Sequence, residues 1–369
     1  MTANSPAAPP VARVFGTLAS RPSARSIESL ALGVGVTAFV FVAVVAIFVF
    51  RFEPAPISGP GSVGEYAAVA SGVATALAVL GARYVVRERT RAGRIGFFDV
   101  VDVVALAFAL AVIVILTLTL LAGIMEQSFQ GATVFGFSVL VLSGATAAIA
   151  AYFTFYLAAE MTLSSLAAVL AVFLVEGVIT SALTASDPQW WKENLSALGM
   201  NNDFSSWAFN ISLIVSGILV TALARLATRG VPTTNPEGVQ RTRVALVVIG
   251  IFLACVGVFP VDEFLAIHNT VATGMAVVFA ITVFRVHSWI PGLARAFRLV
   301  GYLFVAVVVV AGVFFAVGFY TLTAVELIAG ALVFSWIILL VRNCAALVAD
   351  STRNGGDAEA PAPAVNWNP

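Results

Sequence analysis

The segment VVALAFALAVIVILTLTLLAGI, residues 103–124, decides the class of fold because it carries no charged side chain over its whole length. A helix needs about 20 apolar residues to cross the roughly 30 Å hydrocarbon core of a bilayer. Other stretches of the chain reach a similar length, some with one polar residue. The ten predicted spans are residues 30–50, 64–86, 100–124, 132–157, 162–184, 205–228, 244–261, 264–286, 298–319 and 322–343.

The composition agrees with a membrane protein along the whole chain. Of the 369 residues, 60% are hydrophobic and 10% are charged, and the mean hydropathy is +1.02. A soluble domain has about 25% charged residues. No sustained alternation of polar and apolar residues suggests a membrane β-barrel. We therefore predict an all-α polytopic bundle whose partners are membrane lipids. The formal net charge of zero argues against a nucleic-acid partner.

The basic residues predict the orientation, because loops rich in Lys and Arg stay in the cytoplasm. If the amino terminus is cytoplasmic, 17 of the 19 basic residues lie inside, and only Arg51 and Lys192 lie outside. Both termini are then cytoplasmic. All the basic residues except Lys192 are arginines. This bias indicates a GC-rich genome, so we expect the plasma membrane of a prokaryote.

Four segments are expected along the chain. Residues 1–29 form a mobile cytoplasmic amino terminus, and residues 350–369 form a disordered cytoplasmic tail rich in Ala and Pro. Residues 30–157 hold a module of four spans, and residues 158–349 hold a module of six. The two halves of the chain share no motif, which weakens the case for an inverted-repeat transporter.

The longest predicted external loop runs from Ala185 to Phe204, ASDPQWWKENLSALGMNNDF. Its paired Trp190 and Trp191 are typical of an anchor at the membrane interface. A loop of this length could instead fold back over the bundle as a lid. The sequence leaves both interpretations open.

Polar and ionisable residues inside spans are costly in lipid, so each is a functional candidate. Those in this chain lie at the predicted outer side, which suggests a polar pocket that opens outward. The candidate pocket residues are Glu176, Ser196, Asn210, Asp262, His268 and Glu326. Simpler interpretations also exist. Asp262 could cap a helix, His268 could be a satisfied core residue, and Glu326 could be interfacial.

We expect neither a metal nor a cofactor. The two histidines, His268 and His287, lie at opposite ends of one predicted span and cannot share a metal. The chain has no CxxC, HExxH or phosphate-binding loop motif. A hydrolase built on Ser196, His268 and an acid is conceivable. Serines are common, however, so that pattern is weak.

Two motifs in the second half carry a family resemblance. One is ENLSALGM (193–200) followed by WAFNISLIVSGIL (207–219), and the other is GIFLACVGVFPVDEFLAIHNTVATGMA (250–276). They resemble the prokaryotic membrane family catalogued as domain of unknown function 998, over about residues 160–345. A fainter similarity points to Frag1/DRAM/Sfk1-type membrane proteins. The family is uncharacterised, so the resemblance implies no activity. The motif positions are Ser196, Leu198, Gly199, Phe209, Asn210, Gly257, Phe259, Pro260 and His268.

Three functions remain open at this point. The first is binding of a lipid or other amphiphile in the outward pocket. The second is an enzyme acting on a lipid or lipid-linked substrate, with His268 as acid or base. The third is a proton-coupled transporter that uses Glu176 or Glu326. The sequence does not identify a protein partner.

Overall fold

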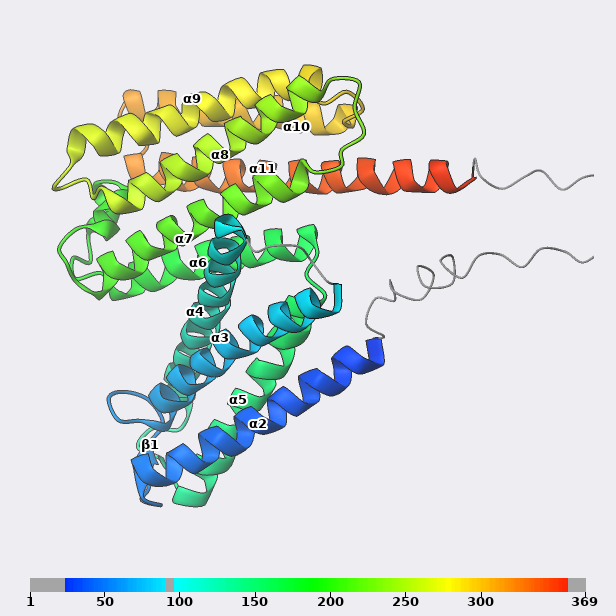
Figure 1. The fold of residues 1–369 in the computed structure, drawn as a ribbon. Helices are drawn as coiled ribbons and strands as arrows, with labels where there is room; N and C mark the ends of the chain where they lie inside the picture. Colours follow the sequence, from blue (N-terminus) through cyan, green and yellow to red (C-terminus); the bar gives the residue numbers. More distant parts are fainter. Residues whose placement is uncertain (1–23, 91–95, 358–369) are drawn as a thin grey trace, which may run out of the picture. The chain divides into compact units, whose positions relative to one another are not determined.

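The computed structural model describes residues 24–90 and 96–357, and the chain divides into two compact units, Met1–Met161 and Thr162–Pro369. In the described residues, ten helices are long and apolar enough to cross a membrane. Each helix satisfies its own backbone hydrogen bonds, as lipid requires. The predicted all-α polytopic bundle is confirmed (Figure 1).

In its described residues, 24–90 and 96–161, the first unit is a four-helix module. Helix α3 packs between α4 and α5, and α5 also packs on α2. Two short strands join the loops at one end of these helices, with Ala55 opposite Val134. The elements are α2 (Ala24–Phe50), β1 (Ala55–Pro56), α3 (Val63–Thr90), α4 (Phe97–Ser128), β2 (Thr133–Val134) and α5 (Gly136–Ala159).

The second unit contains six helices and two short 3-10 turns. Helix α7 is its most buried span, and it packs against α6, α8 and α11. The elements are α6 (Leu163–Thr184), η1 (Trp190–Lys192), η2 (Leu195–Gly199), α7 (Phe204–Ala227), α8 (Pro236–Val258), α9 (Leu265–Trp289), α10 (Arg295–Ala316) and α11 (Leu322–Asp357).

Small residues bring α7 close to its neighbours. A Cβ atom added at Gly250 of α8 would lie 2.6 Å from the carbonyl oxygen of Gly217 in α7. Gly177 of α6 faces Ser212 of α7 in an equally tight contact. Such residues allow helix backbones to approach closely in lipid, where dispersion contacts hold helices together. The small residues Ser212 and Gly217 of α7 therefore lie at close helix contacts in the core of this unit.

The ends of the chain differ in part from the sequence-based expectation. Helix α2 begins at Ala24, within the segment expected to be a mobile amino terminus, and residues 1–23 lie outside the described residues. Helix α11 continues through Asp357, into the expected disordered tail. The run that follows Cys344 is rich in Ala, Leu and Val, so it can extend the helix beyond the apolar span. Residues 358–369 lie outside the described residues.

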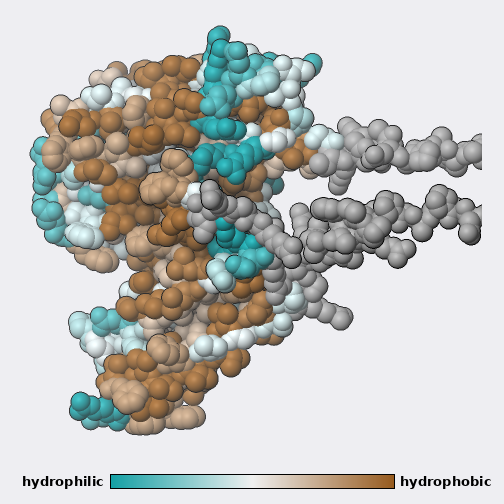
Figure 2. Space-filling view, viewed as in Figure 1, coloured by the Kyte–Doolittle hydropathy of each residue, from teal (hydrophilic) through white to brown (hydrophobic). Residues whose placement is uncertain are grey.

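The surface of each unit has the pattern of a membrane protein. Figure 2 shows apolar side chains covering the flanks of the helices, and hydrophilic side chains gathered towards the helix ends. Phe41, Phe48, Leu303 and Phe315 are among the large apolar residues exposed on these flanks. Lipid tails cover such surfaces without cost, so their exposure here is expected.

Candidate functional site

The loop between α6 and α7, residues Ala185–Asp203, folds back onto the helix ends. We call it the α6–α7 loop. We call the end of the second unit that carries it the outer end, after the predicted orientation. The turns that follow α8 and α10 lie at the same end. The 3-10 turn η2 of this loop is held by polar side chains from α7, α9 and α11. The structure therefore gives the loop the position of a lid over the outer end.

His268 of α9 makes the most buried of these contacts. Only 5% of His268 is exposed, although its neighbours on both sides in α9 are exposed. Its Nε2 atom lies 3.0 Å from Ser196 Oγ in η2, and its Nδ1 atom lies 2.8 Å from the Phe259 carbonyl oxygen. Both ring nitrogens thus have partners, which fixes the orientation of the imidazole.

Glu326 of α11 makes the second contact. Its carboxylate accepts a hydrogen bond from the backbone N–H of Leu195, with an N–O distance of 2.5 Å. Leu195 is the first residue of η2 and directly precedes Ser196, so α9 and α11 hold adjacent residues of the loop.

The third contact comes from α7 and fixes the end of η2. The side-chain amide of Asn210 donates to the Gly199 carbonyl oxygen at 3.0 Å. A Cβ atom at Gly199 would lie 2.6 Å from Asn210 Oδ1, so only glycine fits this approach. The neighbouring Leu198 is 1% exposed, and the Ser205 hydroxyl, which donates to the Ser181 carbonyl oxygen at 2.8 Å, lies 3.4 Å from the Leu198 carbonyl oxygen.

The loop ends in a helix cap. Asp203 Oδ1 accepts the backbone N–H of Ser206 at 2.8 Å, which satisfies a free amide at the start of α7. Asp203 Oδ2 accepts the Ser186 hydroxyl at 2.7 Å, which ties the two ends of the loop together. Hydrogen bonds to the charged form, chiefly from the Ser206 amide, hold the pKa of Asp203 below its usual value.

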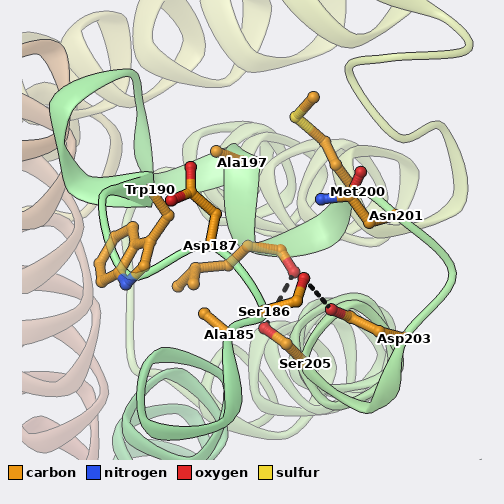
Figure 3. Close-up of a pocket in the computed structure, with 10 residues that line it drawn as sticks. Ala185, Ser186, Asp187, Trp190, Ala197, Met200, Asn201, Asp203 and Ser205 are labelled. Atoms are coloured by element: carbon orange, nitrogen blue, oxygen red, sulfur yellow. Dashed lines mark hydrogen bonds between the residues drawn. The ribbon is translucent and has the colours of Figure 1, made fainter.

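The two loop tryptophans have different surroundings. Trp190 is half-buried and lines a small recess inside the loop, together with Asp187, Met200 and Asp203 (Figure 3). Trp191 is 48% exposed, and Lys192 Nζ lies 5.7 Å from its ring centroid. The recess has about 190 Å³ of empty space, much of it open to solvent, and encloses room for little more than one water molecule. The recess is therefore too small to be the main ligand site.

Helices α9, α10 and α11 meet tightly at the inner end of the unit. Trp336 is 1% exposed, and its ring centroid lies 5.4 Å from that of Phe279 and 5.2 Å from that of Phe297. A Cβ atom at Gly301 would lie 2.8 Å from the Trp336 ring nitrogen and 2.9 Å from Val283. This half of the three-helix contact has no room for another molecule.

The outer halves of α10 and α11 are packed more loosely. Among residues 322–335 of α11, only Thr323 is buried, and residues 313–320 at the end of α10 are all exposed. A Cβ atom at Gly312 of α10 or at Gly330 of α11 would have no neighbouring atom within 4 Å. The structure thus combines a packed inner half with a looser, lipid-accessible outer half, in which α11 contacts the α6–α7 loop.

Two further polar atoms belong to the same region. Thr323 lies three residues before Glu326, on the same face of α11, and Asn194 directly precedes Leu195. The Thr323 Oγ1 and Asn194 Oδ1 atoms are buried and have no hydrogen-bond partner within the described ranges. A buried polar atom without a partner is costly, so it marks a place where a further group can bind.

The remaining predicted pocket residues lie apart from these contacts. Asp262 is exposed in the turn between α8 and α9, and no hydrogen bond joins it to η2 in the part of the chain that the structure describes. Glu176 is half-buried on α6, next to the close contact between Gly177 and Ser212. The described residues contain no group of three or more His, Cys, Asp or Glu side chains that could hold a metal ion.

Comparison with known families gives one match. Residues 165–343 match the family described as protein of unknown function DUF998. The six-helix segment belongs to this family. The match confirms the resemblance inferred from the two motifs. It includes η2 and the three side chains that contact it, Asn210, His268 and Glu326. No curated protein and no solved structure matches the chain. The similarity to Frag1/DRAM/Sfk1-type proteins stays a prediction.

Sequence reasoning missed the partners of the site residues. Backbone groups of Leu195, Gly199 and Phe259 complete the contacts of Glu326, Asn210 and His268 in the DUF998 segment. Backbone groups leave no mark in a sequence. The capping role of Asp203 could have been found, because an Asp directly before an apolar run is a common helix start.

Proposed function

We propose that this multi-pass membrane protein binds an amphiphile of the lipid class at the outer end of its DUF998 segment. The polar head meets the cluster formed by η2, His268, Glu326 and Thr323, and the apolar chain lies along the outer halves of α10 and α11. The convergence of side chains from three helices on η2 carries the proposal. The looser packing around Gly312 and Gly330 supports it.

The charges at this end favour a particular kind of head group. Lys192 is the only basic residue among residues 176–204 and 259–326 that lies at the outer end. The carboxylates there are Glu176, Asp187, Glu193, Asp203, Asp262, Glu263 and Glu326. An anionic head would be repelled by this field. The buried Asn194 Oδ1 atom, which has no partner in the described residues, and the carboxyl group of Glu326 can both accept hydrogen bonds. We therefore infer a cationic, zwitterionic or hydroxyl-rich head that donates hydrogen bonds.

The α6–α7 loop has to move for such a ligand to bind. In the closed arrangement η2 already occupies the hydrogen-bonding groups of His268, Glu326 and Asn210. The loop is tied by a few hydrogen bonds, each with a net worth of about 0.5–1.5 kcal/mol. A ligand that offers equivalent donors can replace them and shift the loop to an open population.

Native mass spectrometry with lipid analysis tests the proposal. The full chain is purified in mild detergent as wild type, as a His268→Ala, Glu326→Gln variant, and as a His287→Ala control. His287 lies on the same helix α9 at the opposite end, so its replacement leaves the proposed site intact. We expect a lipid with an amine or hydroxyl head to copurify with wild type and control but not with the double variant. Equal lipid content in all three proteins would refute the proposal.

The predicted sidedness belongs to the same proposal. With the amino terminus in the cytoplasm of a prokaryotic cell, the α6–α7 loop faces the outside of the plasma membrane. Lysyl endopeptidase cleaves only after lysine, and Lys192 is the only lysine of the chain. Protease added to the outside of protoplasts should therefore cut the protein once. Cleavage only after the membrane is opened would reverse the orientation.

A further inference from the structure

Ser196 and His268 have the geometry of a nucleophile and its general base. Ser196 Oγ lies 3.0 Å from His268 Nε2. In enzymes with a serine nucleophile this distance is about 2.6–3.2 Å, and a third group orients the base. Here the third group is the Phe259 carbonyl oxygen, 2.8 Å from His268 Nδ1. The three groups come from η2, from α9 and from the turn after α8.

The hydrogen bonds of the ring settle which nitrogen carries the proton. A carbonyl oxygen only accepts hydrogen bonds, so Nδ1 must be the donor towards Phe259. In the neutral imidazole Nε2 then has no proton and accepts the hydroxyl proton of Ser196. This is the tautomer that general-base activation of a serine requires.

We propose that Ser196 attacks a carboxylic ester of the bound amphiphile, with His268 as the general base. This inference rests on the proposed binding function. The Ser196 oxygen forms a bond to the acyl carbon while its proton moves to His268 Nε2. The ester C–O bond then breaks, and the leaving alcohol takes the proton from Nε2. Water hydrolyses the acyl-serine by the same sequence and restores both side chains.

The position of the pair in the fold identifies the kind of bond. In an ester-linked lipid, the ester joins the polar head to the apolar chain. Ser196 lies in η2 directly after Leu195, whose backbone N–H contacts Glu326 near the start of α11, and η2 packs against this helix. A bound amphiphile would thus place its ester at the level of Ser196. A ligand that enters while the loop is open meets the half-buried Ser196 once the loop closes again, because closure restores the contact between Ser196 and His268.

A purely structural latch explains the same hydrogen bond, and chemical reactivity separates the two roles. A fluorophosphonate phosphorylates a serine only when a base activates its hydroxyl, whereas a latch serine is inert. The full-length protein in lipid nanodiscs is therefore treated with a fluorophosphonate carrying an alkyl chain. Peptide mass mapping then locates the adduct. Ser186→Ala, in the same loop but outside the pair, is the matched control.

We expect a covalent adduct on Ser196 in the wild type and in Ser186→Ala. In His268→Gln the labelling rate should fall about 100-fold or more, which is the usual loss when a general base is removed. Release of p-nitrophenol from a long-chain p-nitrophenyl ester should be lost in Ser196→Ala. Absence of an adduct on wild-type Ser196 would overturn the inference whether or not any variant folds. Equal labelling of His268→Gln would overturn the role of the base.

The two proposals fail in different ways. A wild-type protein that retains its lipid but gains no Ser196 adduct binds without catalysis, and this overturns only the inference of this subsection. A protein that forms the adduct but carries no lipid in any preparation contradicts the binding function, while the reactivity of Ser196 stands.

Discussion

Replacing His268 with alanine should release the α6–α7 loop from the outer end of the bundle. The change removes the hydrogen bonds to Ser196 Oγ and to the Phe259 carbonyl oxygen. It also leaves these groups beside a small cavity. Each lost hydrogen bond costs about 1 kcal/mol net, and a buried group left without a partner costs more. Only the Ser196 contact joins His268 to the loop, so the loop-opening free energy should fall by about 1–2 kcal/mol.

This change in free energy has a measurable consequence. Because 1.4 kcal/mol is a factor of ten, the open population should rise roughly 5- to 30-fold. Proteolysis tracks the open population when the loop opens and closes faster than it is cut. Lysyl endopeptidase can cleave the chain only in this loop, because Lys192 is the only lysine. The rate of the single cut at Lys192 in detergent should rise by the same factor.

Two variants make the measurement specific. His287→Ala removes the other histidine of α9, far from the loop, and should leave the cleavage rate unchanged. Ser196→Ala removes only one hydrogen bond, so its effect should be about fivefold. Ser196→Ala combined with His268→Ala should add little to the effect of His268→Ala, because the two residues share one contact. A folded His268→Ala protein that is cut at the wild-type rate would refute the idea of a latched lid.

Three further changes test the local geometry. Gly199→Ala should open the loop and speed the Lys192 cut by about five- to tenfold, because its Cβ pushes on Asn210 Oδ1 and breaks a hydrogen bond of about 1 kcal/mol. Asp203→Ala should destabilise the start of α7 by about 1 kcal/mol at neutral pH, whereas Asp203→Asn should keep most of the cap. The pKa of Asp203 is lowered on folding. The stabilisation that ionised Asp203 gives the folded protein is therefore complete above the usual carboxyl pKa. It is lost as the pH falls through the lower pKa of Asp203 in the folded protein. A pH series of thermal unfolding should show this loss for wild type but not for Asp203→Asn. Gly250→Leu should force α8 away from Gly217. The overpacking should lower the free energy of unfolding by about 1–3 kcal/mol or more, and the unfolding temperature with it. An unchanged melting curve for Gly250→Leu would contradict the close crossing.

The membrane spans could be predicted well because they follow from length and hydropathy alone. Residues 162–184 were predicted as a span, and the helix runs from Leu163 to Thr184. The short strand pair at Ala55 and Val134 could not be predicted, since a two-residue strand has no period to detect. The extension of α11 through Asp357 was not predicted, because the Ala- and Pro-rich composition of residues 350–369 favours a disordered tail.

The site was only partly predictable for a different reason. The depth of Asn210, His268 and Glu326 along their spans predicts one shared end of the six-helix segment, and in the structure all three contact η2. Each of them, however, contacts a backbone group of η2 or of Phe259, and the motifs do not show which backbone group a side chain reaches. Asp262 had the same predicted depth, yet it lies exposed in a turn. Depth alone therefore does not tell whether a polar residue faces the lid.

The position of the bound amphiphile is the central claim, and photo-crosslinking tests it most directly. A phospholipid that carries a diazirine in its acyl chain and an amine head is incorporated with the full-length protein, and adducts are mapped by mass spectrometry. Gly330→Leu fills the looser space on α11, and Gly123→Leu on α4 of the first unit is the matched control, since a Cβ atom there also meets no neighbour. The account predicts adducts concentrated on the outer halves of α10 and α11, lost in Gly330→Leu and kept in Gly123→Leu. Adducts spread evenly over the lipid-facing helices, and unchanged by Gly330→Leu, would contradict it.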